Sequence, residues 1–225
     1  MVEKIKKLVY DILCKDDSGH GYDHVERVYK LAMKFAKKEN ADEEVVALIA
    51  LLHDVDDYKM FGEAQAEDLT NAKKIMNCVG VSKEKQENVL SSLKRFGYKN
   101  CTKGIRPESL EGKIVSDADM CDAIGANGIL RTYQFGAKYG RSFFNKSINP
   151  NTDLNVNEYM GKVVDSSVTH MFEKLLKLKG LMITNSGKEE ANNRHDLMVK
   201  FLYQLFDEEE AIDWKIYLNK YLENL

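Results

Sequence analysis

Residues 48–59 read LIALLHDVDDYK, and this stretch places charged side chains where a buried helix is expected. Five apolar or small residues run directly into His53 and Asp54, and two further acids, Asp56 and Asp57, follow. Burying an unpaired carboxylate costs more free energy than one such helix can offset. Three arrangements would compensate the charge: a bound cation, a network of salt bridges, or a helix end that emerges into water.

Helical periodicity extends through most of the chain, which contains only two prolines, so we predict an all-α protein. Asp23 is expected to cap the second helix, and Asn40 and Glu43 are expected to form a capping box for the helix that carries the opening stretch. The segment from Tyr139 to Asn155 is rich in Gly, Pro, Asn and Ser and is predicted to be a long loop of the kind that serves as a lid or binding segment. Further helices are predicted over residues 2–14, 64–78, 83–95, 108–138, 156–180, 188–207 and 209–224, with the helix 108–138 weakened by Gly125, Gly128 and Gly136.

The composition narrows the range of functions. A net charge of -3 and a pI near 6.0 give no reason to expect a nucleic acid polymer as partner. No apolar stretch is long enough to cross a bilayer, and the N-terminus lacks the pattern of a signal peptide. The four cysteines show neither CxxC spacing nor the density of a disulfide framework, so reduced thiols and a cytoplasmic location are expected. Formation of a homo-oligomer stays open.

Three of the five histidines lie in the first quarter of the chain: His20, His24 and His53. His24 and His53 fall on the predicted inward faces of separate helices, where a single histidine is more often a core residue. Their combination with Asp54 and with a later acid on an apolar face favours metal binding instead. That later acid is Asp119, which shares a predicted helix face with Val115, Asp122 and Ala126.

Two imidazoles and two carboxylates form a borderline-to-hard site for one divalent ion, such as Mn, Mg, Fe, Ni or Zn. Four protein ligands on an octahedral ion leave positions for a water and a substrate oxygen, and the metal lowers the pKa of such a water toward neutrality. The neighbouring acids Asp56 and Asp117 are expected to be solvated.

The order of a histidine, a His-Asp doublet and a distant aspartate resembles the HD-domain metal-dependent phosphohydrolases. It is closer still to a bacterial subgroup, the YedJ/YpgQ-like HD hydrolases, across nearly the whole chain. The motifs that carry the resemblance are DHVERV (23–28), ALLHDVDDYK (50–59), LEGKIVSDADMCDAIGANGILRTYQFG (110–136), THMFEKLLKLKGLM (169–182) and RHDLMVKFL (194–202).

The resemblance implies a single HD-domain hydrolase over residues 1–225. It would be an HD-domain helical bundle, with its core at about 20–125 and additional C-terminal helices at about 156–225. It also implies that the ligands of the ion are His24, His53, Asp54 and Asp119.

The activity implied by the resemblance is hydrolysis of a phosphate ester or anhydride, with a nucleotide as the leading small-molecule substrate. Two alternatives stay open: a cyclic-nucleotide or dinucleotide phosphodiesterase, and a nucleotide-binding regulatory protein with little turnover. Where the subgroup usually has Arg and Leu after the last metal-binding aspartate, this chain has Met120 and Cys121. This departure leaves the metal ligand Asp119 in place, but the substrate details of the subgroup do not carry over directly to this chain.

The remaining candidate site residues would serve the chemistry that the resemblance implies. Asp57, expected one helical turn beyond His53, is predicted to orient the water or a ligand imidazole, with a solvated acid at the C-terminal end of the helix as the alternative. His20 is predicted to reach in from a loop as a phosphate or proton-transfer group, with a surface histidine as the alternative. Phosphate transfer also needs cations, and the predicted substrate-binding residues are Lys99, Arg131 and Arg141. A solvated surface position is the alternative for each of these three residues.

His170 and His195 are expected to serve structure, because neither has an acidic partner at ligand spacing. The second doublet, His195-Asp196, lacks an apolar run before it and is not expected to bind metal. The lysines of residues 169–183 are expected to form the solvated side of a core helix.

Overall fold

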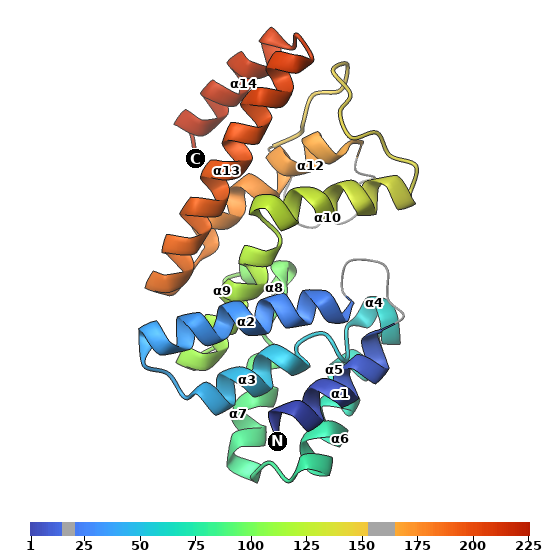
Figure 1. The fold of residues 1–225 in the computed structure, drawn as a ribbon, viewed down its shortest axis with the longest axis vertical. Helices are drawn as coiled ribbons and strands as arrows, with labels where there is room; N and C mark the ends of the chain where they lie inside the picture. Colours follow the sequence, from blue (N-terminus) through green and yellow to red (C-terminus); the bar gives the residue numbers. More distant parts are fainter. Residues whose placement is uncertain (15–20, 153–164) are drawn as a thin grey trace. The chain divides into compact units, whose positions relative to one another are not determined.

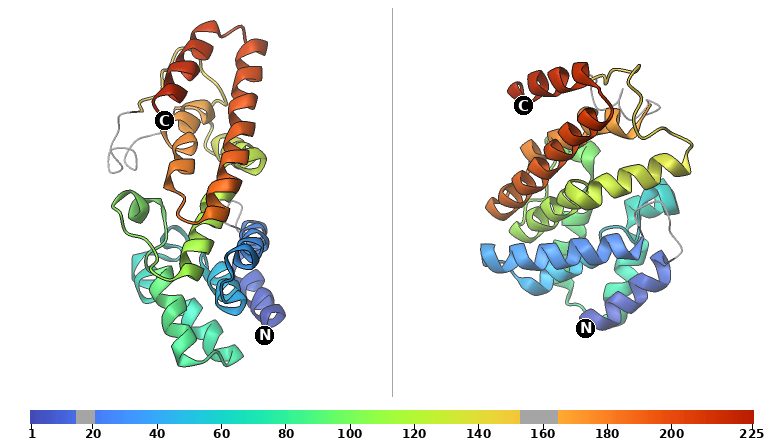
Figure 2. Two further views of the ribbon diagram at one scale, coloured as in Figure 1. Left: turned by 90° about the vertical axis from the view of Figure 1, so that its left-hand side faces the viewer. Right: turned by 45° about the horizontal axis from the view of Figure 1, so that its top comes forward.

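The computed structural model describes residues 1–14, 21–152 and 165–225 (Figures 1 and 2). It divides into an N-terminal unit, Met1–Asp119 with Ile183–Gly187, and a C-terminal unit, Met120–Met182 with Lys188–Leu225. The described ranges contain helices and loops and no β-strand, which confirms the predicted all-α fold. Within these ranges, no helix has the length and apolar character needed to cross a membrane.

The helices that lie in the N-terminal unit, or begin in it, are α1 (Val2–Leu13), α2 (Tyr22–Glu39), α3 (Glu43–Leu52), α4 (Tyr58–Phe61), α5 (Glu63–Asp68), α6 (Thr70–Val79), α7 (Lys83–Leu93), α8 (Tyr98–Thr102) and α9 (Leu110–Asp122). Helix α3 is the centre of this unit, because every residue from Val45 to Leu52 is buried. It packs against α1, α2 and α7, each of which turns an apolar face toward it. The apolar residues of α3 therefore lie in the core of this unit, and His53 follows directly at the end of the helix.

The C-terminal unit contains α10 (Gly125–Lys138), α12 (Ser167–Glu173), the 3-10 helix η1 (Leu175–Leu181), α13 (Asn185–Glu208, whose first three residues belong to the N-terminal unit) and α14 (Ile212–Glu223). Its core is aromatic: the rings of Phe172 and Phe206 stack with centroids 6.5 Å apart, and Trp214 lies 5.7 Å from Phe206. The buried leucines of η1 confirm that residues 169–183 contribute to the core. Part of the predicted loop and of the predicted helix 156–180 lies outside the described residues.

Two helices predicted as continuous are interrupted by residues with positive φ. The predicted helix 108–138 ends at Asp122 and restarts at Gly125, whose φ is +76°. A Cβ at Gly125 would lie 3.0 Å from side-chain atoms of Arg194, so glycine suits both the backbone conformation and the close packing. The predicted helix 64–78 is likewise divided at Leu69, whose φ is 53°. Both predictions of a continuous helix were wrong.

The predicted helix caps were also wrong. Asp23 lies inside the first turn of α2, and Gly21 occupies the cap position. Asp42 caps α3, because its carboxylate accepts two backbone N–H groups of the first turn at 2.9 and 3.2 Å. Asn40 instead ends α2 in the left-handed conformation, so it cannot form the predicted capping box with Glu43.

Asp56 was expected to be solvated, but it is buried, with only 4 % of its surface exposed. Its two carboxylate oxygens accept the backbone N–H groups of Asn71 and Ala72, both at 2.9 Å, and Gln65 donates to it at 3.2 Å. Asn71 and Ala72 lie in the first turn of α6, where backbone N–H groups have no partner within the helix. Asp56 therefore acts as an N-cap supplied from a distant part of the chain.

Replacing Asp56 by alanine is expected to lower the free energy of unfolding by roughly 1–3 kcal/mol, the cost of losing a cap and leaving buried donors without a partner. Urea denaturation followed by circular dichroism, with a chelator present to exclude metal effects, would measure the change. Asp68→Ala is the control, because Asp68 is an exposed acid of α5 and its loss should cost less than about 0.5 kcal/mol. Equal stability of the two variants would contradict the capping role.

Candidate metal centre

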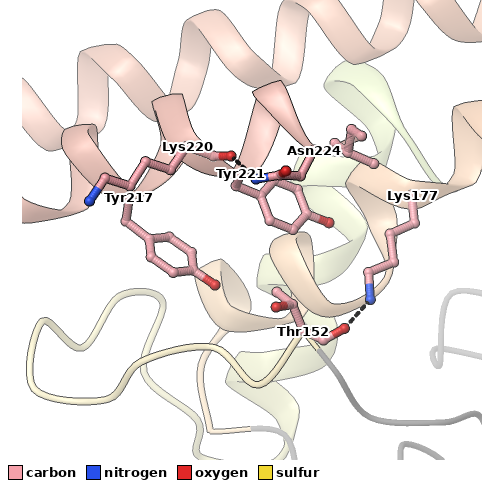
Figure 3. A pocket seen from close by; sticks show the side chains of 7 residues that line it. Thr152, Lys177, Tyr217, Lys220, Tyr221 and Asn224 are labelled. Atoms are coloured by element: carbon pink, nitrogen blue, oxygen red, sulfur yellow. Dashed lines mark hydrogen bonds between the residues drawn. The ribbon is translucent and has the colours of Figure 1, made fainter.

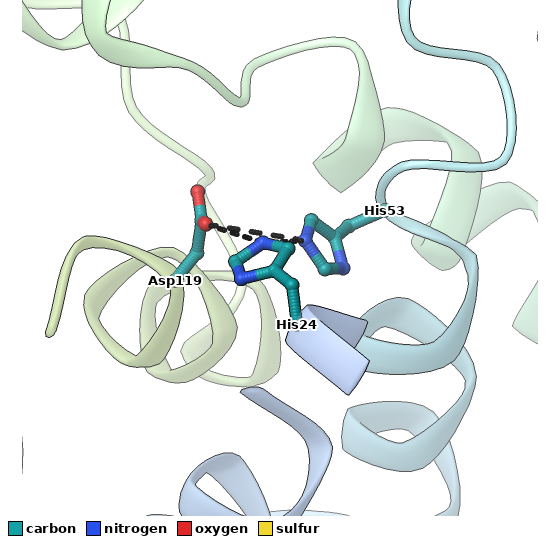
Figure 4. Close-up of side chains that lie close together, drawn as sticks. All are labelled: His24, His53 and Asp119. Atoms are coloured by element: carbon teal, nitrogen blue, oxygen red, sulfur yellow. Dashed lines mark hydrogen bonds and ion pairs between the residues drawn. The ribbon is translucent and has the colours of Figure 1, made fainter. Parts of the chain in front are cut away.

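The structure brings His24, His53 and Asp119 together from three elements of the N-terminal unit (Figure 4). His24 lies in the first turn of α2, and His53 directly follows the last residue of α3. Asp119 lies on α9 and faces both imidazoles. The cluster thus joins parts of the chain that are distant in sequence.

The ligand atoms are close enough to share one ion. The Nε2 atoms of His24 and His53 are 3.2 Å apart, and Oδ1 of Asp119 lies 3.4 Å from the first and 3.9 Å from the second. Oδ2 of Asp54 lies 3.4 Å from Nε2 of His24 and 3.5 Å from Nε2 of His53. Ligands at about 2.0–2.6 Å from a common ion are separated by roughly 3–4 Å when they occupy adjacent positions. The two imidazoles and the Asp119 carboxylate therefore form a group whose ligand atoms all lie within 4.8 Å of one another and could hold a metal ion, and Oδ2 of Asp54 adjoins both imidazoles.

The orientation of His53 also fits a metal ligand. Its Nδ1 lies 2.8 Å from the carbonyl oxygen of Ala50, so the Nδ1–H form donates to that carbonyl. This hydrogen bond directs the lone pair of Nε2 into the cluster, as a hydrogen bond to the other ring nitrogen does in metal-binding histidines.

Burial and charge act in opposite directions on this cluster. Only 2 % of His24 and 8 % of Asp54 are exposed. Burial opposes ionisation of Asp119, but its hydrogen bond with His24 and the charges of His53 and His24 outweigh this effect and lower the pKa of its carboxyl group. A cation at this position would compensate the charges of Asp54 and Asp119. A bound cation was one of the three arrangements expected from the sequence around His53.

The structure describes only one of the two predicted catalytic residues, His20 and Asp57. His20 lies outside the described residues. Asp57 does not lie one helical turn beyond His53, because α3 ends at Leu52 and the chain turns there. The backbone carbonyl of Asp57 accepts the N–H groups of Met60 and Phe61 at 3.0 Å, so this residue begins α4.

The predicted substrate cations lie in both units. Lys99 is an exposed residue of α8 in the N-terminal unit. In the C-terminal unit, Nη1 of Arg131 pairs with the buried carboxylate of Asp122 at 2.8 Å. The guanidinium carbon of Arg141 lies 5.6 Å from the ring centroids of both Phe135 and Tyr139.

Asp117 was expected to be solvated, and this expectation was wrong. The side chain is completely buried and accepts hydrogen bonds from the Thr184 hydroxyl and from the backbone N–H groups of Ile183 and Thr184. A sequence pattern gave little sign of this role, because the partners lie more than sixty residues away.

The second His-Asp doublet lies in α13, apart from any cluster of metal ligands among the described residues. His195 is buried, and burial together with the charge of Lys179 lowers its pKa to about 4. It is therefore a neutral core imidazole at pH 7, as expected for a structural histidine.

A cavity of about 570 Å³ lies in the C-terminal unit (Figure 3). Its walls include Lys177 and Lys220 together with the rings of Tyr217 and Tyr221. The described residues that line it contribute no histidine and no acidic side chain, so this cavity offers no metal ligands of the predicted kind.

Comparison with known proteins places these observations in a family. The HD domain family matches residues 21–124. YpgQ of Bacillus subtilis (strain 168) is 34 % identical over 94 % of this chain and 95 % of its own length. An HD-superfamily hydrolase from Bacillus thuringiensis has a similar structure, with a TM-score of 0.72, 35 % identity, and coverage of 93 % of this chain and 97 % of that one. The structure of Bacillus subtilis YpgQ in complex with ADP gives a TM-score of 0.70 at 28 % identity, with coverage of 92 % and 97 %.

Proposed function

The chain belongs to the HD-domain superfamily of hydrolases, and we propose that within it the chain is a metal-dependent phosphohydrolase that acts on nucleotides. The observation that carries the proposal is the cluster in which carboxylate oxygens of Asp54 and Asp119 lie 3.4 Å from Nε2 of His24. The ADP bound to the relative YpgQ supports a nucleotide as the substrate class.

In this proposal His24, His53, Asp54 and Asp119 hold one divalent ion. When bound, such an ion supplies Lewis-acid activation of water and neutralises charge on a phosphoryl group. The buried imidazoles fix the position of the centre, and the partial exposure of the Asp119 side chain, 31 %, gives a substrate a way to approach it. Asp57 and His20 are the proposed groups that orient the attacking water and transfer its proton.

Lys99, Arg131 and Arg141 are the proposed partners of the substrate phosphates. A polyphosphate carries more negative charge than one divalent ion neutralises, so further cations are needed near the oxygens that gain charge. A guanidinium has five N–H donors, so the ion pair of Arg131 with Asp122 is compatible with phosphate binding.

A substrate screen tests the proposal. Protein loaded with Mn²⁺ is incubated with nucleoside mono-, di- and triphosphates and with cyclic mono- and dinucleotides, and phosphate and pyrophosphate are detected separately. We expect hydrolysis of a non-cyclic nucleotide, loss of that activity after chelation, and its return when Mn²⁺ is added back. Release of pyrophosphate from a triphosphate would identify a nucleoside triphosphate pyrophosphohydrolase.

Three results would contradict the proposal. Turnover restricted to cyclic nucleotides or dinucleotides would identify a phosphodiesterase. Tight nucleotide binding without turnover by metal-loaded protein would identify a regulatory protein. Activity that persists at full strength after complete metal removal would contradict the role of the ion itself.

A further inference from the structure

A buried carboxylate outside the metal cluster lies on the same helix as Asp119. Oxygen Oδ2 of Asp117 accepts hydrogen bonds from the backbone N–H of Ile183 at 3.0 Å, from the backbone N–H of Thr184 at 2.7 Å and from the Thr184 hydroxyl at 2.8 Å. The exposed fraction of Asp117 is 0 %. We call these contacts the Asp117 clamp.

The Asp117 clamp holds the segment Ile183–Gly187. This segment belongs to the N-terminal unit, although the residues before it, Met120–Met182, belong to the C-terminal unit. The Thr184 hydroxyl donates to Asp117 and accepts the backbone N–H of Gly187 at 3.0 Å. A Cβ at Gly187 would lie only 2.3 Å from Oδ2 of Asp117. Glycine is therefore required for the segment to approach the carboxylate this closely.

The position of Asp117 on α9 connects the clamp to the metal centre. Residues two apart in an α-helix are separated by about 200° around its axis. The clamp therefore holds one side of α9, while Asp119 faces His24 and His53 from the opposite side. Asp119 also lies in the last turn of α9, which ends at Asp122, and terminal turns fray unless tertiary contacts hold them.

Burying the Asp117 carboxylate costs free energy unless its oxygens accept hydrogen bonds. A buried carboxylate loses its hydration, and the hydrogen bonds from the Ile183 and Thr184 backbone and from the Thr184 hydroxyl replace it. A buried polar network with its hydrogen bonds formed specifies one geometry more sharply than apolar packing does.

We propose that Asp117 is a positioning residue for the metal centre, whose clamp fixes the turn of α9 that directs Asp119 toward His24 and His53. This inference rests on the proposed metal-binding role of Asp119. Asp117 does not touch the ion, and it acts through the orientation of Asp119.

The test uses the purified full chain and two readouts: Mn²⁺ affinity by calorimetry and the visible spectrum of bound Co²⁺, which reports the ligand geometry. Asp117→Ala should weaken Mn²⁺ binding by about 10- to 100-fold, the range for lost support of a metal ligand, and should alter the spectrum. Thr184→Val removes one donor and should weaken binding by about three-fold. Thr184→Ser keeps the hydroxyl and should restore wild-type behaviour.

Glu39→Ala is the matched control, because Glu39, the last residue of α2, accepts the backbone N–H of Ser186 at 2.7 Å and so binds the same segment from a different helix. It should lower Tm and leave the Mn²⁺ affinity and the Co²⁺ spectrum unchanged. The inference is overturned if Asp117→Ala binds both ions as the wild type does. If Asp117→Ala does not fold, the inference is overturned when Thr184→Val binds Mn²⁺ as tightly as the wild type. It is also overturned if Glu39→Ala loses as much Mn²⁺ affinity as the clamp variants do.

The outcome for the wild type separates this inference from the proposed function. A wild-type chain that binds metal but hydrolyses no nucleotide contradicts the proposed function and leaves the positioning role to be decided by the variants. A wild-type chain that binds no divalent ion contradicts both.

Discussion

His53→Ala and Asp54→Ala should each abolish metal retention and reduce nucleotide hydrolysis to the background rate, while the helical circular dichroism spectrum stays close to that of the wild type. The reason is that both side chains point into the cluster with His24, at 3.2 and 3.4 Å from its Nε2 atom. The core of the N-terminal unit is supplied instead by the apolar residues of α3. Removing one ligand leaves an incomplete coordination sphere around any ion.

Metal content after dialysis, measured by elemental analysis, and steady-state hydrolysis would check this result. Asp68→Ala serves as control, because it removes an exposed acid of the same unit and should change neither quantity. If either ligand variant loses its helical signal and yields no folded protein, the ion has a structural role and its binding is coupled to folding.

Arg131→Ala should reduce kcat/KM for a nucleoside triphosphate by roughly one to three powers of ten, the scale of losing a charge-assisted contact or a transition-state donor. Metal affinity should change little. A simple phosphate monoester used as a reporter should be affected less, because it presents fewer oxygens to hold. Steady-state kinetics on the two substrates, together with metal calorimetry, measures all three quantities.

The ion pair of Arg131 with Asp122 makes a second variant informative. Asp122→Asn removes the charge of the partner and keeps the guanidinium, so it should preserve most of kcat/KM if Arg131 binds phosphate. Equal losses on both substrates in Arg131→Ala would assign Arg131 to the support of the fold. An unchanged kcat/KM would show that Arg131 does not take part in the reaction.

The sequence predicted regular helices well where their apolar periodicity is uninterrupted. The predicted helix 83–95 corresponds to α7 at Lys83–Leu93, and 209–224 corresponds to α14 at Ile212–Glu223. It failed at Leu69, whose positive φ separates α5 from α6, and at Gly125, whose positive φ begins α10 after α9 has ended at Asp122. Single residues of this kind depend on packing that periodicity does not contain.

The buried acids show the same limit within the candidate site. Local spacing predicted that His24 faces inward and that Asp119 lies on an apolar helix face. In the structure, Nε2 of His24 and Oδ1 of Asp119 are 3.4 Å apart. Asp56 and Asp117 were misread as solvated, because the groups that bind them are 15 and 66 residues away in the chain. Local patterns can identify an acid that needs compensation, but they do not identify the donors that supply it.

Asp54 and Asp56 lie in the same turn of the chain. Asp54 lies in the candidate metal centre, whereas Asp56 accepts hydrogen bonds from the first turn of α6. This arrangement implies thermodynamic reciprocity. If melting of the first turn of α6 also disturbs the backbone that holds Asp54, then ion binding and formation of that turn favour each other by the same factor. A substitution in α6 would then weaken ion binding without altering a single ligand, and depletion of the ion would loosen a helix that does not touch it.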